Sequence, residues 1–338
     1  MKQPIQVSAP WRDLARFITQ LQPDKLAVLV DENTHALCYP IIKEYFPAHK
    51  LIQISSGEIH KTIETCSSIW QALTDAQFSR HSLLVNLGGG VIGDMGGFCA
   101  STYKRGIRFI NIPTTLLAQV DASVGGKLGI DFGGFKNQIG VFQIPDLVFA
   151  HPVFLKSLPE AELRSGFAEV IKHALISDTA WWNELSQKAW QNQDWEKHIR
   201  LSIALKERIT TEDPTEKGIR KVLNFGHTLG HAIESLLLNT ERKLLHGEAI
   251  AVGMVLASLL SQKKAGLSEA EGIAIRQYIA SQFSLPRFSE EEIRQIIALA
   301  HQDKKNQQGI IKMVLLEGIG KPVFDIAVSE QEIAEVFQ

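Results

Sequence analysis

Short runs of apolar residues, each stopped by a turn-forming residue, mark the first half of the chain. Segments at helical spacing lie between them, and this alternation predicts a parallel sheet with helices on its faces. Ligands of such sheets lie beyond the carboxyl ends of the strands. Asp31, the glycines after Leu87 and Thr114-Thr115 all follow predicted strand ends, so we expect them to line one crevice. The predicted strands are Lys25–Val30, Ser82–Leu87 and Phe109–Ile112, and a clear helix is Ile63–Ala76.

The pattern becomes helical from about Pro159 onward, where apolar residues recur at helical spacing. This change places a soft domain boundary near residues 150–160, around Pro152 and Pro159. We therefore predict an α/β, Rossmann-like N-terminal domain with a mainly parallel sheet (residues 1–155) and an all-α C-terminal domain (residues 156–338). The predicted helices are Ala161–Ser177, Trp195–Glu212, Gly218–Leu238, Gly247–Lys264, Ser268–Phe283 and Glu290–His301.

Composition narrows the class of protein. The chain has 338 residues, 45% of them hydrophobic and 21% charged, which is typical of a globular protein and not of a disordered one. A net charge of −2 lacks the basic excess of a nucleic-acid binder. The longest apolar run, Ala249–Ser261, is shorter than the ~20 residues that span a bilayer. We expect a cytoplasmic protein that binds neither nucleic acid nor membrane. The three cysteines fit a reducing compartment and a role as small buried hydrophobic residues.

The first chemical motif is the segment Gly88-Gly-Gly-Val-Ile-Gly-Asp94, which follows a predicted strand. Its spacing matches G-x-G-x-x-G, and a helix beginning near Gly93 would offer free N–H groups to a pyrophosphate. The acidic residue expected about twenty positions later is missing, because Pro113 stands there. Asp31 could bind the ribose instead. The motif alone leaves a nucleotide site and a plain glycine turn as alternatives.

The second motif contains His227 and His231, four residues apart and therefore on one helix face. Neutral imidazole is a common zinc ligand, and a catalytic zinc has three protein ligands. The third ligand could be His246 or Glu169, and a purely structural histidine pair is the alternative. The neighbouring glycines would leave room for something bulky beside this helix face.

Cations near glycines or amides form the third group. Lys127 follows Gly125-Gly126, and Lys136-Asn137 also resembles a loop, so both suit phosphate binding by N–H groups and an ammonium. Each isolated lysine is otherwise expected to be a solvated surface residue. From the residues alone, we infer an enzyme that uses a nucleotide and a metal ion on an anionic substrate.

Taken together, these motifs resemble the 3-dehydroquinate synthase family. The resemblance rests on segments that occur in the family's order and, with Asp31 and Lys305, cover nearly the whole chain. They are Gly88–Asp94, Pro113–Lys127, Lys136-Asn137, Gly166–Lys172, Leu223–His231 and Leu245–Glu248.

The resemblance implies a dehydroquinate synthase-like fold, with an N-terminal domain that binds NAD and a C-terminal domain that binds zinc or cobalt. It implies a homodimer with the active site between the domains. The reaction would convert the sugar phosphate 3-deoxy-D-arabino-heptulosonate 7-phosphate to 3-dehydroquinate and phosphate, the second step of the shikimate pathway. Its steps would be transient oxidation by NAD at carbon 5, phosphate elimination, re-reduction, ring opening and intramolecular aldol closure.

Residue roles follow from the same resemblance. The metal ligands would be Glu169, His227 and His246, which makes His231 a substrate residue rather than a ligand. The NAD residues would be Asp31, Glu58, Lys61, Gly89, Gly90, Val91, Asp94, Thr114 and Thr115, with Asp121, Lys127, Lys136 and Ser157 around cofactor and substrate. The catalytic and substrate residues would be Lys127, Asn137, Lys172, Lys206, Arg220, Asn224 and His231. Arg105 would reach the neighbouring subunit's phosphate, and Lys305 or Lys304 would add a late phosphate contact, with Lys305 favoured.

Several positions depart from the family pattern, and rival functions remain open. Leu128 and Ser157 stand where threonine is common, and the loop Phe132–Phe135 differs from other members. One rival is another sugar-phosphate cyclase, such as 2-deoxy-scyllo-inosose synthase, whose substrate lacks the carboxylate. A second is a glycerol-dehydrogenase-like oxidoreductase, and a third is an inactive metabolite-binding protein.

Overall fold

The computed structural model describes residues 4–133, 135–301 and 310–337, and the chain forms two compact units. The first unit contains Met1–Pro159 and Trp195–Glu207, and the second contains Glu160–Asp194 and Arg208–Gln338. The segment Trp195–Glu207, which the sequence pattern groups with the helical part, therefore packs with the first unit. The single helix α8 (Trp195–Glu212) begins in one unit and ends in the other.

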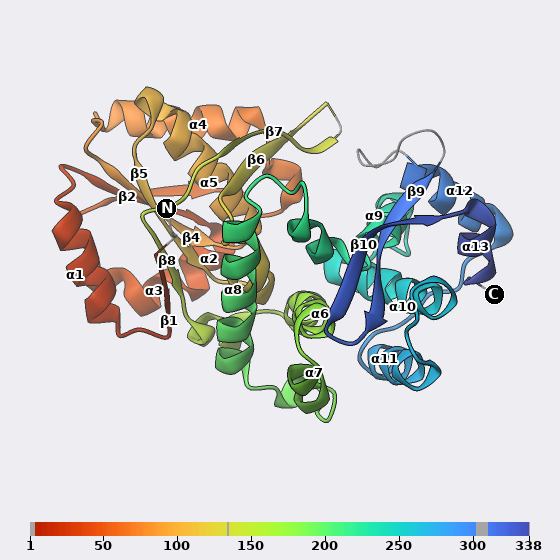
Figure 1. Cartoon of the computed structure of the whole chain (residues 1–338). Helices are drawn as coiled ribbons and strands as arrows, with labels where there is room; N and C mark the ends of the chain where they lie inside the picture. The colour runs from red at the N-terminus through yellow and green to blue at the C-terminus, as the bar shows by residue number, and fades with distance from the viewer. Residues whose placement is uncertain (1–3, 134, 302–309, 338) are drawn as a thin grey trace. The chain divides into compact units, whose positions relative to one another are not determined.

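A six-stranded parallel sheet forms the centre of the first unit (Figure 1), in the order β1-β8-β5-β4-β2-β3. The three predicted strands are β2, β4 and β5, and each lies within one residue of its predicted bounds. The strands are β1 (Ile5–Val7), β2 (Leu26–Asp31), β3 (Lys50–Ile54), β4 (Leu83–Gly88), β5 (Arg108–Pro113) and β8 (Leu147–Ala150).

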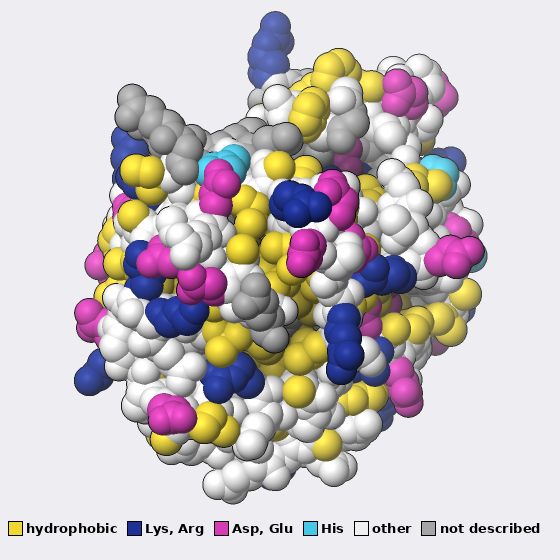
Figure 2. Space-filling model, turned by 90° about the vertical axis from the view of Figure 1, so that its right-hand side faces the viewer, with side chains coloured by type: hydrophobic (Ala, Val, Ile, Leu, Met, Phe, Trp, Pro, Cys, Tyr) yellow, Lys and Arg dark blue, Asp and Glu magenta, His cyan; other side chains and the backbone are white. Residues whose placement is uncertain are grey.

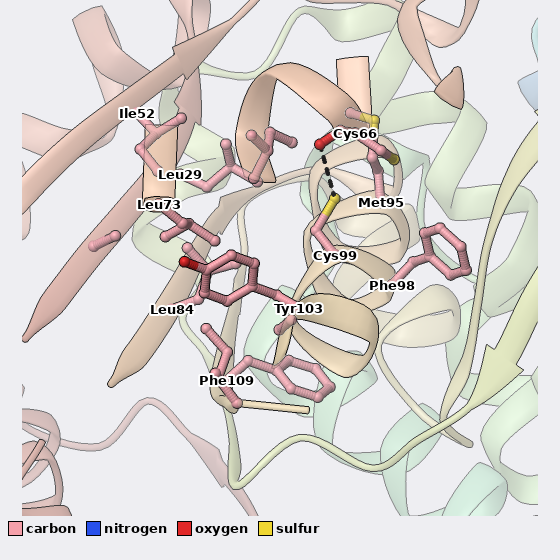
Figure 3. Close-up of a cluster of buried hydrophobic side chains, with 14 of the residues drawn as sticks. Leu29, Ile52, Cys66, Leu73, Leu84, Met95, Phe98, Cys99, Tyr103 and Phe109 are labelled. Atoms are coloured by element: carbon pink, nitrogen blue, oxygen red, sulfur yellow. Dashed lines mark hydrogen bonds between the residues drawn. The ribbon is translucent and has the colours of Figure 1, made fainter. Parts of the chain in front are cut away.

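Successive side chains of each strand point to opposite faces of the sheet, so both faces are apolar. Helices cover both of them. Leu84 and Phe109 face a cluster built by α4 (Ile63–Asp75) and α5 (Gly90–Thr102). Their strand neighbours Leu83 and Ile110 face the opposite cluster, with α1 (Trp11–Leu21) and α3 (Tyr39–Ile42). Figure 3 shows the first cluster, where Cys66 and Cys99 lie among apolar side chains. All three cysteines are free and buried, as predicted.

An antiparallel hairpin of β6 (Lys127–Phe132) and β7 (Phe135–Phe142) packs on α5 through Leu128 and Ile130. Lys127, Lys136 and Asn137 thus lie in strands, and the expectation that they occupy loops is wrong. The glycines before Lys127 do form a turn, since Gly125 and Gly126 both have positive φ, but strand β6 begins at Lys127 itself. The remaining short elements are α2 (Glu32–Leu37), four 3-10 helices (Lys43–Tyr45, Glu58–His60, Tyr103–Arg105, Pro152–Ser157) and a π-helical turn (Ala118–Ala122).

The second unit is mainly helical, but the expectation of an all-α domain needs one correction. An antiparallel pair, β9 (Ile311–Gly318) and β10 (Lys321–Val328), packs against the helix His246–Lys264. Alternating apolar residues, such as Ile311, Met313 and Leu315, line its buried face. The helices are α6 (Glu160–Ser177), α7 (Thr179–Leu185), α9 (His227–Leu237), α10 (His246–Lys264), α11 (Glu269–Gln282), α12 (Glu290–His301) and α13 (Glu330–Glu335), with 3-10 turns at Trp190–Asn192 and Ile219–Asn224.

The predicted helix 218–238 is interrupted at Gly226, whose φ of 78° is accessible mainly to glycine. The glycines beside the histidines also have a different role from the one expected. A methyl group at Gly253 would lie 2.0 Å from the carbonyl oxygen of Gly226, and one at Gly230 would lie 2.8 Å from Ile250. The space beside the helix face is therefore filled by α10, whose backbone approaches α9 closely.

The surface carries both signs of charge. On the face in Figure 2, basic and acidic side chains are interspersed around apolar patches. Within the part of the chain that the structure describes, no helix is long and apolar enough to cross a membrane.

Candidate functional site

The glycine turn and the end of β5 meet in the first unit. Gly88 and Pro113 are register partners at the ends of β4 and β5, and the Thr114 N–H donates to the Gly88 carbonyl at 3.0 Å. A methyl group on Gly89 would lie 3.0 Å from Thr115 Cγ2. Strand β2 lies next to β4 and runs parallel to it. Asp31, the last residue of β2, therefore lies at the same edge of the sheet. The predicted crevice residues are thus brought together.

Helix α5 begins at Gly90, three residues before the expected start near Gly93, with Gly89 as its N-cap. The first-turn N–H groups of a helix have no partner within the helix and attract anions. Gly89 and Gly90 carry no side chain over this turn, which leaves its N–H groups accessible to a pyrophosphate.

Asp31 caps the helix that follows it. The Thr34 N–H donates to Asp31 Oδ1 at 2.7 Å, and the Asp31 N–H donates to Thr34 Oγ1 at 2.9 Å. Cys38, which the sequence did not indicate, lies near Thr114 and Ser157, and burial raises the pKa of its thiol to about 11. These contacts gather three of the residues assigned to NAD around one end of the sheet.

Among the lysines assigned to the NAD site, Lys61 is the most buried, with 3% of its surface exposed. Its Nζ donates to Asp94 Oδ2 and to Asn137 Oδ1, both at 2.7 Å, and lies 3.9 Å from Glu58 Oε1. Burial alone would lower the pKa of Lys61, but the carboxylates of Asp94 and Glu58 outweigh it and raise the pKa. Lys61 is therefore a charged, fully engaged side chain.

The anion-binding candidates are divided between the two units. Lys206 lies in the first unit, where its Nζ is 2.8 Å from the Asp121 carboxylate, whereas Arg220, Asn224 and His231 belong to the second. Lys127 and Lys136 are exposed on β6 and β7. Arg105 lines an open hollow of the first unit, together with Ser79, Arg80, His81 and Lys104. Lys304 and Lys305 lie outside the described residues.

A cluster of imidazole and carboxylate groups forms in the second unit from three helices. Glu169 on α6 is fully buried, and its Oε1 lies 3.5 Å from His227 Nε2 on α9 and 3.6 Å from His246 Nε2 on α10. An ion with tetrahedral bonds of 2.0–2.2 Å holds its ligand atoms roughly 3.3–3.6 Å apart. Both distances from Glu169 Oε1 therefore fit a common divalent metal ion, and His227 and His246 each have a ring nitrogen within 4.8 Å of one of the other's.

His231 belongs to the same cluster. Its ring centroid lies 5.1 Å from that of His227 and 5.6 Å from that of His246. One nitrogen of each of these three histidines lies within 4.8 Å of the others, so they form a second geometrically acceptable ligand set. The structure brings together all four residues that the sequence left as alternatives.

Hydrogen bonds determine which ring nitrogens of His227 and His246 are available to a metal ion. His227 Nδ1 lies 3.2 Å from the Phe225 carbonyl, and His246 Nδ1 lies 3.1 Å from Glu234 Oε2. Because both oxygens only accept, each Nδ1 must carry the hydrogen, and each Nε2 faces Glu169. Glu234 was missed as a candidate, although its position seven residues after His227 places it on the same helix face.

The electrostatics of the cluster are asymmetric. Burial and the nearby Lys172 ammonium hold the pKa of His227 well below its usual value. Burial also opposes charge on His246, but Glu169 and Glu234 raise its pKa to about 9. Lys172 forms an ion pair with Glu169 on the same helix. A metal ion at this point would displace the proton on His246 Nε2.

The start of α10 is attached to α6, one turn before Glu169. The Gly247 N–H donates to Ser165 Oγ at 3.0 Å, and Arg164 pairs with Glu248 at 3.2 Å. A methyl group at Gly247 would lie only 1.9 Å from the Ser165 carbonyl oxygen. This close contact sets the position of His246 relative to Glu169.

A tight loop positions Arg220 and Asn224. Asp213 accepts N–H bonds from Lys217, Gly218 and Arg220, and these bonds lower its pKa against the effect of burial. Asn224 Nδ2 donates to Glu216 Oε1 at 2.8 Å. Neither Asp213 nor Glu216 stands out in the sequence, because the acidic and lysine-rich segment resembles a solvated turn.

Known proteins resemble this chain over almost its whole length. A model of the 3-dehydroquinate synthase N-terminal region matches residues 51–165, and a model of its C-terminal region matches residues 166–306. The 3-dehydroquinate synthase of Parabacteroides distasonis is 42% identical over 328 residues, which cover 96% of this chain and 93% of that protein. The chain belongs to the 3-dehydroquinate synthase family. It is therefore an enzyme, and the resemblance inferred from its motifs is confirmed.

Solved structures of related cyclases share the fold of this family member. A 2-deoxy-scyllo-inosose synthase, complexed with carbaglucose-6-phosphate, NAD+ and Co2+, has a TM-score of 0.88 at 24% identity, covering 100% of this chain and 98% of that one. ValA, a 2-epi-5-epi-valiolone synthase from Streptomyces hygroscopicus subsp. jinggangensis 5008 with NAD+ and Zn2+ bound, has a TM-score of 0.85 at 26% identity, covering 99% and 96%. The predicted fold class is confirmed, apart from the hairpin in the helical unit.

Proposed function

We propose that this enzyme converts 3-deoxy-D-arabino-heptulosonate 7-phosphate to 3-dehydroquinate and phosphate, the second step of the shikimate pathway. The observation that carries the proposal is that His227 and His246, from two helices, meet the carboxylate of Glu169 on a third helix at 3.5 and 3.6 Å. The family relationship selects the reaction from among those that a metal and a nucleotide can perform.

The first unit would bind NAD, and we place the NAD-binding domain at residues 1–155. The N–H groups at Gly89–Val91 would take the pyrophosphate, Asp31 would accept bonds from the ribose, and Thr114 and Thr115 would flank the turn. NAD held there would supply reversible hydride transfer at carbon 5 of the substrate. The other residues assigned here are Glu58, Lys61, Asp94, Asp121, Lys127, Lys136 and Ser157.

The second domain, residues 156–338, would hold a zinc or cobalt ion on Glu169, His227 and His246. We favour this set over the three histidines because a carboxylate offsets the positive charge of the ion in a buried place. When bound, the ion polarises the substrate oxygens next to the carbon that is oxidised. His231 then remains to contact the substrate.

The remaining cations would hold the two anionic groups of the substrate, its phosphate and its carboxylate. Fixed cations and amides orient a substrate before the reaction and so lower the entropic part of the barrier. The residues assigned here are Lys127, Asn137, Lys172, Lys206, Arg220, Asn224 and His231, with Arg105 and Lys305 as further phosphate contacts. We also propose a cytoplasmic homodimer, in keeping with the family and with three buried free thiols.

Release of inorganic phosphate tests this function directly. The purified chain with NAD and Zn2+ should release one phosphate per heptulosonate phosphate, without net accumulation of NADH absorbance at 340 nm. A chelator should stop the release, and Co2+ should restore it. A sugar phosphate without the carboxylate should be a poor substrate. Accumulation of NADH in step with substrate consumption would contradict the proposal and indicate a dehydrogenase.

Glu234→Leu is expected to weaken metal binding about 10–100-fold, because it removes the carboxylate that orients His246. The measurement is titration of the metal-free protein with Co2+, followed by its visible absorbance. Glu330→Leu is the matched control, since Glu330 forms a similar contact with His301 at 2.8 Å away from the cluster. Equal losses in both variants would show that Glu234 has no special role.

A further inference from the structure

Asn137 lies on the exposed hairpin strand β7, in an unusual backbone conformation. Its φ is 50°, a left-handed value that costs energy for a residue other than glycine. Its N–H donates to Asp131 Oδ1 at 2.8 Å, and the Asp131 N–H in turn donates to the Lys61 carbonyl at 2.9 Å. The backbone around Asn137 is thus tied to the segment that carries Lys61.

The side chain of Asn137 contacts the same lysine. Lys61 Nζ lies 2.7 Å from the carboxamide of Asn137 and 2.7 Å from Asp94 on α5. An ammonium group can only donate hydrogen bonds, so it must face the oxygen of the carboxamide and not its nitrogen. This contact fixes the amide orientation, which a structure otherwise leaves ambiguous.

The fixed orientation decides what Asn137 offers to a ligand. With Oδ1 held by Lys61, the two N–H groups of Nδ2 point away from the lysine and have no partner among the described residues. Two donors directed outward suit an anionic oxygen, such as that of a phosphate ester. A flipped amide would present an acceptor to the same anion and repel it.

We propose that Lys61 is a positioning residue, which locks the Asn137 carboxamide so that its N–H groups meet the anionic group of the substrate. Toward the substrate, Lys61 acts through Asn137. The bond to Asp94 holds the ammonium in place and links the phosphate-binding strand to the helix at the nucleotide turn. The inference rests on the proposed function, in which Asn137 is one of the residues that hold the anionic groups of the substrate.

A double-mutant cycle tests the inference with Lys61→Met, Asn137→Ala and the variant that carries both. The readouts are the Kd of inorganic phosphate for the NAD-loaded enzyme, by calorimetry, and the KM for the heptulosonate phosphate. Each single change should weaken phosphate binding roughly tenfold, the loss of one bond to a charged partner. In the Asn137→Ala background, Lys61→Met should have no further effect, and Lys61→Arg in the native background should retain most of the affinity.

Additive losses in the cycle would overturn the inference, as would a Lys61→Met variant that loses NAD affinity while it keeps phosphate affinity. Lys25→Met is the matched control, because Lys25 Nζ donates to the Ala76 carbonyl elsewhere in the same unit. It should change neither constant.

Asn137→Asp provides a second variant if Lys61→Met does not fold. It keeps an acceptor for Lys61 but replaces the outward N–H groups by an oxygen, so it should bind phosphate more weakly than Asn137→Ala does. Affinity equal to or above that of Asn137→Ala would overturn the proposed amide orientation. A different result would contradict the proposed function itself, namely that the unmodified enzyme releases no phosphate from the heptulosonate phosphate. The double-mutant cycle with inorganic phosphate can still be measured in that case.

Discussion

Replacing His227 by alanine is expected to abolish turnover and to weaken metal binding by more than about a hundredfold, while the chain stays folded. A ligand supplies a direct bond to the ion, so its loss exceeds the 10–100-fold effect of an outer residue. The imidazole lies at the first residue of α9, and a smaller side chain there leaves the helix intact. Metal content by elemental analysis and phosphate release measure the two effects.

Two further variants make the ligand assignment specific. His301→Ala removes a histidine from the surface pair with Glu330 and should leave both the metal content and the rate unchanged. His231→Ala should keep the metal and raise the KM for the substrate, whereas loss of the ion would support the alternative set of three histidines. Near-normal turnover by His227→Ala at full metal content would rule out His227 as a ligand.

Gly247→Ala is expected to destabilise the second unit by about 3 kcal/mol or more and to disturb metal binding. The new methyl group would lie 1.9 Å from the carbonyl oxygen of Ser165. Because this oxygen belongs to the backbone, the clash can be relieved only if one of the two helices shifts. The shift would displace His246, the preceding residue, from Glu169. Urea unfolding and Co2+ titration of the metal-free protein measure the two effects.

Gly318→Ala offers a control in the same unit. A methyl group there would lie 3.5 Å from its nearest neighbour, Glu271 Oε1, an ordinary contact distance. This variant should unfold at nearly the same urea concentration as the unmodified protein. If Gly247→Ala were equally stable and bound Co2+ normally, the close contact between α6 and α10 would not be what positions His246.

Local patterns in the sequence predicted much of the fold. The strands β2, β4 and β5 and the helices α6, α8 and α12 lie close to their predicted bounds, because hydrophobic periodicity is a property of neighbouring residues. The break at Gly226 and the hairpin β9-β10 were missed. Gly226 adopts its left-handed turn because α10 approaches it closely, and that approach depends on residues far along the chain.

The sequence by itself determined the family, the glycine turn and the pair His227 and His231, because each of these is a short segment whose spacing is fixed by one turn or one helix. Tertiary structure alone decided which side chains meet. Glu169 and His246 join His227 only through the packing of three helices, and Lys61 reaches Asp94 and Asn137 across 33 and 76 residues of chain. Such contacts form because buried polar groups must find partners in the folded core, a requirement that acts in space and leaves no spacing in the sequence.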